Sequence, residues 1–176
     1  MAHLRRSDIL RALEALASEI PATSPPLQLL LVGGAAMVLL YDARETTKDV
    51  DAVPLGSAEA EALRAAALKV AGRLQLPEDW LNDGAKGYVH GLVLGSVLLN
   101  RPRLVVSTPA PQQLLAMKLC AWRDDVDIGD ARLLLSKVPG DRLQVWNLVE
   151  PHLVPGRELK AQYAFADLWE AERGSP

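Results

Sequence analysis

Two aspartates, Asp49 and Asp51, stand one residue apart in a segment whose other positions, Val50 and Ala52, are apolar. Side chains at positions i and i+2 of a strand project from the same face, so the spacing predicts two carboxylates side by side. Carboxylates this close repel each other unless a cation lies between them or one takes up a proton. Mg²⁺ suits such a pair because it prefers hard oxygen ligands and is usually shared with substrate phosphates. We therefore expect Asp49 and Asp51 to hold a divalent metal.

A glycine pair, Gly33-Gly34, follows a short apolar run and precedes a stretch of good helix formers. Glycine lets a phosphate approach the backbone, and a helix N-terminus offers free N–H groups and a partial positive charge. A phosphate-binding turn facing a metal-binding pair is what nucleotidyl transfer needs. A glycine pair alone usually marks only a turn, and an Asp-x-Asp motif alone usually marks a solvated strand edge. The combination of the two is more specific for a nucleotide site. Arg44 can bind phosphate, clamp Asp51, or lie in a solvated loop.

A second set of charged residues lies in the C-terminal half. Lys118 interrupts an apolar helical run, while Asp127 and Asp130 are spaced to share one face of a helix. They can form a second acidic wall that pairs with Lys118 or Arg123. Two alternatives stay open, because a lysine in an apolar run usually reaches solvent and aspartates near a helix start stabilise its dipole. The histidines at 3, 90 and 152 show no metal-ligand spacing.

The order of these residues resembles the signature of the nucleotidyltransferase superfamily. The motif runs from Leu31 to Ala36 around the glycine pair and continues with Arg44, Thr46 and the acidic pair; it is closest to the AbiEii/MenT-type branch. Two later blocks resemble an uncharacterised nucleotidyltransferase-like family of bacterial proteins. They are Trp80-Leu81-Asn82-Asp83 with Lys86-Gly87, and Ser107-Thr108-Pro109 with Leu114 to Leu119, Arg123, Asp127 and Asp130-Ala131. The likeness covers about Leu30 to Leu135.

The resemblance implies a Mg²⁺- or Mn²⁺-dependent enzyme that transfers a nucleoside monophosphate from a nucleoside triphosphate to an acceptor hydroxyl. The acceptor would be RNA, a protein or a small molecule, with tRNA the first to try if the chain belongs to the toxin branch of toxin–antitoxin pairs. The expected residues are catalytic Asp49, Asp51, Lys118 and Asp130; metal-binding Asp49 and Asp51; and nucleotide-binding Gly33, Gly34, Arg44, Thr46 and Lys118.

One departure favours a different class of protein. Polymerase-like members of the superfamily carry a third carboxylate on the strand beside the acidic pair, and the strand we expect there, Arg103–Ser107, has none. The general base of the reaction is then missing, or Asp127 or Asp130 takes its role. The alternative is a catalytically inactive module that binds a protein partner, as an antitoxin-like regulator would. Trp80 and Asn82 can line the cleft, with Trp80 stacking on a base, although a core position is the favoured interpretation of the tryptophan.

The pattern of apolar residues predicts an α+β (α/β) fold: a small mixed sheet of the nucleotidyltransferase type followed by a helical C-terminal half. We expect a single domain over 1–176, with a core at about 27–107 and a helical part at about 108–174. The predicted strands are 27–32, 47–53, 97–99 and 103–107; the predicted helices are 7–20, 35–41, 57–74, 108–123, 126–137, 141–149 and 157–173. Ser7 is the expected N-cap of the first helix, and Thr108-Pro109 the expected start of the fourth.

Composition narrows the class of protein. The net charge of −3 is not the strongly basic balance of a nucleic-acid coat protein, and 49% apolar residues are too many for disorder. The single cysteine, Cys120, excludes an internal disulfide framework and is expected to be a buried thiol. No apolar stretch reaches the 18 residues of a membrane span, and the N-terminus lacks the pattern of a signal peptide. We expect a cytoplasmic protein with no membrane partner.

Overall fold

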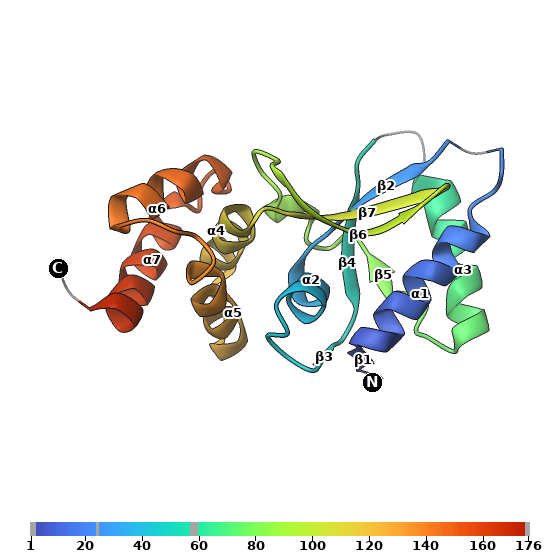
Figure 1. The fold of residues 1–176 in the computed structure, drawn as a ribbon, viewed down its shortest axis with the longest axis horizontal. Coiled ribbons are helices and arrows are strands. Elements are labelled where there is room, and N and C mark those ends of the chain that lie inside the picture. The colour runs from blue at the N-terminus through green and yellow to red at the C-terminus, as the bar shows by residue number, and fades with distance from the viewer. Residues whose placement is uncertain (1–2, 24, 57–59, 175–176) are drawn as a thin grey trace. The chain divides into compact units, whose positions relative to one another are not determined.

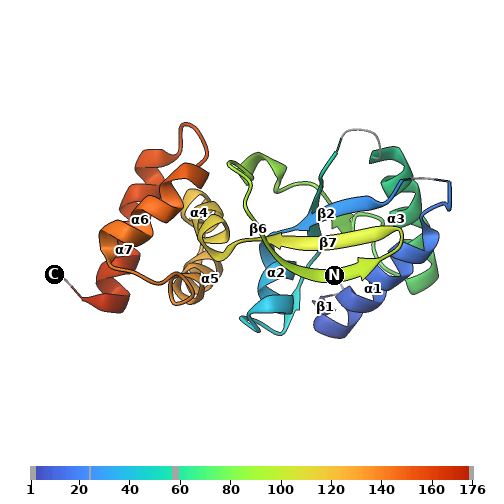
Figure 2. The same ribbon diagram turned by 45° about the horizontal axis from the view of Figure 1, so that its top comes forward.

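The computed structural model describes residues 3–23, 25–56 and 60–174. These fall into two compact units, the first comprising 1–86 with 95–108 and the second 87–94 with 109–176. The fold class is α+β, as predicted: in the described residues, helices accompany a five-stranded mixed sheet and a separate two-stranded ladder (Figures 1 and 2). The single-domain assignment remains a prediction, and each unit is described by itself.

The first unit is built on the five-stranded sheet, whose order is β5-β4-β2-β7-β6. These strands are β2 (Leu27–Leu31), β4 (Val50–Pro54), β5 (Leu81–Asn82), β6 (Leu94–Arg101) and β7 (Leu104–Pro109). The central strand β2 pairs antiparallel with β4 and parallel with β7, and β4 pairs parallel with β5. Because β2 has neighbours on both sides, its leucines at 27, 29, 30 and 31 are buried, as a continuous apolar run predicts.

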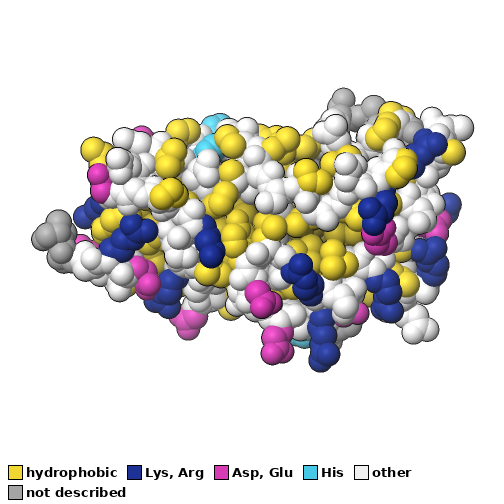
Figure 3. Space-filling model, viewed as in Figure 1, with side chains coloured by type: hydrophobic (Ala, Val, Ile, Leu, Met, Phe, Trp, Pro, Cys, Tyr) yellow, Lys and Arg dark blue, Asp and Glu magenta, His cyan; other side chains and the backbone are white. Residues whose placement is uncertain are grey.

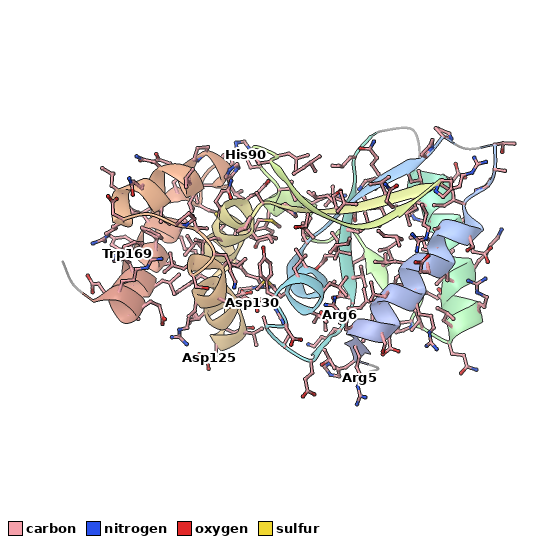
Figure 4. All side chains as sticks on the ribbon, viewed as in Figure 1. Arg5, Arg6, His90, Asp125, Asp130 and Trp169 are labelled. Carbon is pink, nitrogen blue, oxygen red and sulfur yellow. The ribbon has the colours of Figure 1, made fainter. Side chains whose placement is uncertain are left out.

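The helices of the first unit are α1 (Arg6–Glu19), α2 (Gly33–Leu40) and α3 (Ala60–Leu74), of which α1 and α3 pack side by side (Figure 1). The small ladder joins β1 (Leu4–Arg5) to β3 (Thr46–Thr47). Arg6 donates hydrogen bonds to the carbonyls of Val38 and Leu39 at the end of α2 (Figure 4). This contact satisfies carbonyls that have no partner within the helix and fastens α1 to α2.

The second unit is helical. It contains α4 (Pro111–Ala121), α5 (Asp125–Leu135), α6 (Arg142–Val149) and α7 (Glu158–Arg173), with a short 3₁₀ turn at Glu150–His152. Another 3₁₀ turn, Lys86–Tyr88, begins at the last residue of the first unit's 1–86 segment. Helix α4 packs against the other three helices (Figure 1), so all its residues from Gln113 to Ala121 are buried. The Cys120 thiol is among them, which confirms the expected buried thiol.

Several boundaries differ from the predicted ones. Helix α1 begins at Arg6 with Arg5, not Ser7, as its N-cap, because the Asp8 carboxylate accepts a hydrogen bond of 3.0 Å from the Arg5 amide. Strand β7 continues through Thr108 and Pro109, so the next helix starts at Pro111. Proline does occupy the first helical position, as predicted, but two residues later. Ser57 and its neighbours to 59, the predicted start of the third helix, lie outside the described residues.

The surface carries charges of both signs, and Lys and Arg side chains are interspersed with Asp and Glu on the visible face (Figure 3). This agrees with the small net charge of −3. In the described part of the chain, no helix is both long enough and apolar enough to cross a bilayer.

Trp80 is a core residue of the first unit. It is 0% exposed, and its indole nitrogen donates a 3.0 Å hydrogen bond to the Ala67 carbonyl of α3. Its own carbonyl accepts from the Val50 amide, which ties the tryptophan to the start of β4. The core interpretation of Trp80 is therefore confirmed, and a fully buried ring has no free face for stacking on a base.

Replacing Trp80 with Phe should lower the free energy of unfolding by about 2–4 kcal/mol, because it removes the indole hydrogen bond and leaves a cavity. Chemical denaturation measures the change. The control is Leu143→Ala at a side chain that is 68% exposed, where we expect less than about 0.5 kcal/mol. Equal effects of the two substitutions would contradict the core role of Trp80.

Candidate functional site

The predicted glycine turn lies directly against the acidic strand. The Val32 amide donates a 2.9 Å hydrogen bond to the Asp51 carbonyl, which extends the β2–β4 pairing to the start of α2. Gly33 has φ of +61°, and a β-carbon built on it would lie 2.8 Å from Asp51 Oδ2. The Asp51 carboxylate therefore lies against the Gly33 backbone, at the positive end of the α2 dipole.

Gly34 makes an equally close approach to the segment before the acidic pair. A β-carbon on Gly34 would collide with the Thr47 hydroxyl and lie 3.7 Å from the Arg44 guanidinium. Arg44 thus lies beside the glycine turn, where the sequence predicted a phosphate ligand. Thr46 pairs with Arg5 in the small ladder. Because side chains alternate along a strand, it points away from the face on which Thr47 meets Gly34.

Asp49 and Asp51 are both half-buried and share a neighbour, Asn82 of β5. The Asn82 amide nitrogen donates a 3.0 Å hydrogen bond to Asp49 Oδ2, and its oxygen accepts one of 2.9 Å from the Gly84 amide. In the parallel β4–β5 pairing, Asn82 stands opposite Asp51. A β-carbon on Gly84 would lie 3.6 Å from Asp51 Oδ1. Both carboxylates therefore lie beside the Asn82–Gly84 turn.

The structure corrects the prediction about the strand beside the acidic pair. Of the expected strand 103–107, residues 104–107 belong to β7, which β2 separates from β4, so the strand expected beside the acidic pair is not adjacent to it. The true outer neighbour is β5, which is too short to show periodicity in the sequence, and it presents an amide, Asn82, at the level of Asp51.

Sequence reasoning offered Asn82 as a residue that could line the cleft, but it did not identify its contact with Asp49, and it did not place Thr47 or Gly84 among the site residues. Asn82 and Gly84 carry a recognisable local signal, since an asparagine two residues before a glycine commonly accepts a hydrogen bond from that glycine's amide. Thr47 carries none, because only the fold brings its hydroxyl to Gly34.

The donor set of this site fits a divalent cation shared with phosphate. The Asp51 carboxylate lies between the close approaches of Gly33 and Gly84, and the half-buried Asp49 carboxylate is joined to the same turn through Asn82. In the described ranges, no group of three or more His, Cys, Asp or Glu side chains is arranged to hold a metal. A cation bound by two carboxylates alone needs further oxygen ligands, which Mg²⁺ usually takes from water and substrate phosphates.

The second cluster predicted from the sequence lies inside the second unit. Lys118, only 9% exposed, places its amino group 2.8 Å from Asp127 Oδ1 and 2.7 Å from Asp130 Oδ2. Arg123 adds a 2.9 Å ion pair to Asp127. Lys118 therefore does not reach out to solvent but joins both carboxylates of α5, on which Asp130 is labelled in Figure 4. Asp124 caps α5, accepting from the Asp127 amide.

The electrostatics of Asp127 follow from these partners. Burial alone would raise the pKa of this carboxyl, since Asp127 is 1% exposed. Hydrogen bonds from Arg123 and then Lys118 stabilise the carboxylate form more strongly, so the pKa lies well below its ordinary value of 3.8. Asp127 therefore stays ionised at neutral pH and holds Lys118 in place.

The fold is mixed α+β, with a glycine turn set against an acidic strand. The chain belongs to the family described as "Nucleotidyltransferase of unknown function (DUF6036)", whose model matches residues 8–144. This confirms the superfamily resemblance. Comparison with curated proteins finds no match, and comparison with solved structures finds none either.

Replacing Gly33 with Ala should destabilise the first unit by about 1–3 kcal/mol, because alanine is strained at this positive φ and would press on Asp51. The matched control is Gly72→Ala in α3, where a β-carbon meets nothing within 4 Å. That substitution should stabilise by about 0.5–1 kcal/mol through helix propensity. Chemical denaturation compares the two, and a Gly33→Ala variant as stable as Gly72→Ala would refute the close approach of Asp51.

The contribution of Asp127 to the free energy of unfolding should depend on pH. Because its folded pKa is lowered, this contribution is fully present above the ordinary value of 3.8 and is lost as the pH falls towards the folded value. Between about pH 4 and pH 2, the free energy of unfolding should therefore fall less steeply in Asp127→Asn than in the wild type. Asp167→Asn, an exposed position of α7, should keep the wild-type slope. Equal slopes in all three proteins would contradict the ion-pair network.

Proposed function

We propose that this protein transfers a nucleoside monophosphate from a nucleoside triphosphate to an acceptor hydroxyl. The observation that carries the proposal is the position of the Asp51 carboxylate against Gly33 at the N-terminus of α2, with Asp49 linked to the same strand end through Asn82. Backbone N–H groups at such a terminus attract phosphate, and the two carboxylates attract a divalent cation. Family membership supports the same reaction class.

In this proposal the glycine turn, with Arg44 beside it, binds the phosphates, and Asp49 and Asp51 hold Mg²⁺ or Mn²⁺. A bound cation would neutralise the triphosphate and lower the pKa of the acceptor hydroxyl. The acceptor oxygen bonds to the α-phosphorus, the bond from that phosphorus to the bridging oxygen breaks, and pyrophosphate leaves. A carboxylate takes the hydroxyl proton. Thr46 and Lys118 as nucleotide ligands, and Lys118 and Asp130 as catalytic residues, remain predictions.

The acceptor follows from the resemblance rather than from the geometry. The Arg44-x-Thr46 pattern before the acidic pair is similar to the AbiEii/MenT-type branch, so we propose tRNA as the first RNA to test and a toxin–antitoxin context for the protein. A protein hydroxyl or a small molecule is the alternative acceptor. The proposal locates the reaction in the cytoplasm.

The ion pairs and burial of Lys118 favour a second function. Its amino group is bound by Asp127 and Asp130 and is nearly inaccessible, so a phosphate would have to displace a carboxylate from it. A chain in which this network is purely structural would be a catalytically inactive module that binds nucleotide or a protein partner, as an antitoxin-like regulator would. The assay below separates the two functions.

The test is incubation of the protein with each labelled nucleoside triphosphate, Mg²⁺ or Mn²⁺, and total RNA, followed by detection of label on macromolecules. Asp49→Asn and Asp51→Asn should each lower transfer by about 100-fold or more, since several kcal/mol of charge stabilisation is removed. Asp167→Asn is the matched control. Transfer that persists in the Asp49→Asn/Asp51→Asn variant would refute the site, and nucleotide binding without transfer in the wild type would support the inactive module.

A further inference from the structure

We propose that Asn82 is a positioning residue that orients Asp49 while adding no charge to the acidic pair. Its side-chain amide joins Asp49, which lies ahead of β4, to the Gly84 amide in the following turn, and its backbone stands opposite Asp51 in the strand pairing. The inference deepens the proposed function and rests on it, because it assigns Asn82 a role toward the cation that Asp49 and Asp51 would hold.

The orientation of the Asn82 amide is fixed by its partners. The Gly84 N–H can only donate, so the Asn82 atom 2.9 Å from it must be the oxygen. The other atom is then the nitrogen, which faces Asp49 Oδ2 at 3.0 Å and must donate. The turn therefore determines that a donor points at Asp49, and this holds one carboxylate oxygen in a single direction.

An aspartate at position 82 would keep the turn but would place a negative group against Asp49 instead of a hydrogen-bond donor. One of its oxygens would still accept from Gly84, whereas the other would replace the amide nitrogen and face Asp49 Oδ2 at hydrogen-bond distance. Three negative groups would then share the site. The amide thus limits the site to two carboxylates, so that a cation would bind weakly on its own and more strongly with the phosphate oxygens of a nucleotide.

Asn82→Asp separates a positioning role from a merely structural one, because the two side chains have the same shape and both can close the turn to Gly84. We expect Asn82→Asp to bind Mn²⁺ alone, without nucleotide, about ten-fold more tightly than the wild type, since ligand charge count raises affinity. Electron paramagnetic resonance of free Mn²⁺ gives the binding constant. The matched control is Asn100→Asp, which adds the same charge at an exposed position of β6.

A metal-free measurement tests the contact itself. In EDTA, Asn82→Asp should lower the Tm by about 3–6 °C, because it replaces a hydrogen bond with like-charge repulsion. The swapped variant Asp49→Asn/Asn82→Asp restores a donor–acceptor pair with the original net charge, and it should recover most of this loss. Failure of the swap to recover stability would overturn the contact.

The outcomes distinguish this inference from the proposed function. Tighter Mn²⁺ binding in Asn82→Asp but not in Asn100→Asp, together with recovery of stability in the swap, supports the positioning role. Mn²⁺ binding that is no tighter in Asn82→Asp than in Asn100→Asp overturns it, even if the wild type binds Mn²⁺–ATP. A wild type that binds no Mn²⁺–ATP, with Asn82→Asp still gaining affinity for Mn²⁺, would instead overturn the proposed function.

Discussion

The hydrogen bond from the Val32 amide to the Asp51 carbonyl is the constraint on which the candidate site depends. It continues the antiparallel pairing of β2 and β4 to the residue where α2 begins, and so brings the Asp51 carboxylate against the Gly33 backbone. Only glycine fits there, because the position combines a positive φ with a carboxylate oxygen 2.8 Å from where a β-carbon would lie. The glycine turn and the acidic pair, separate in sequence, are one structural feature.

The two charged clusters of the protein differ in how their charge is balanced. Asp127 and Asp130 are buried and joined to Lys118, with Arg123 on Asp127, so that cluster is internally neutralised. Asp49 and Asp51 are half-buried, and their contacts include the neutral Asn82 amide and the N-terminus of α2. A hydrogen-bond donor orients a carboxylate without removing its charge. The contact with Asn82 therefore adds no charge to the acidic pair, while the Lys118 network is suited to holding α4 and α5 together.

Much of the fold could be predicted from the sequence because its signals are local. The buried run before Gly33 and the alanine- and leucine-rich helices follow from hydrophobic pattern and glycine or proline boundaries. Strand order could not be predicted, because it depends on long-range pairing, and the expected neighbour of the acidic strand, β7, is separated from it by β2. For the same reason the sequence indicated neither the contact of Thr47 with Gly34 nor that of Asn82 with Asp49, since the fold brings these residues together. For Lys118, spacing indicated the carboxylate partners but not the depth of burial.

The short strand β5 explains how the proposed site can work with two carboxylates. It supplies an amide at the level of Asp51, so the sheet positions a hydrogen-bond donor at a place where another acid would repel its neighbours. Under the proposed function, the oxygen ligands that the protein lacks would come from the triphosphate. The cation and the nucleotide would then bind cooperatively, because each supplies the opposite charge that the other needs. The division of charge between protein and substrate, rather than the number of acids in the chain, would determine when the site is occupied.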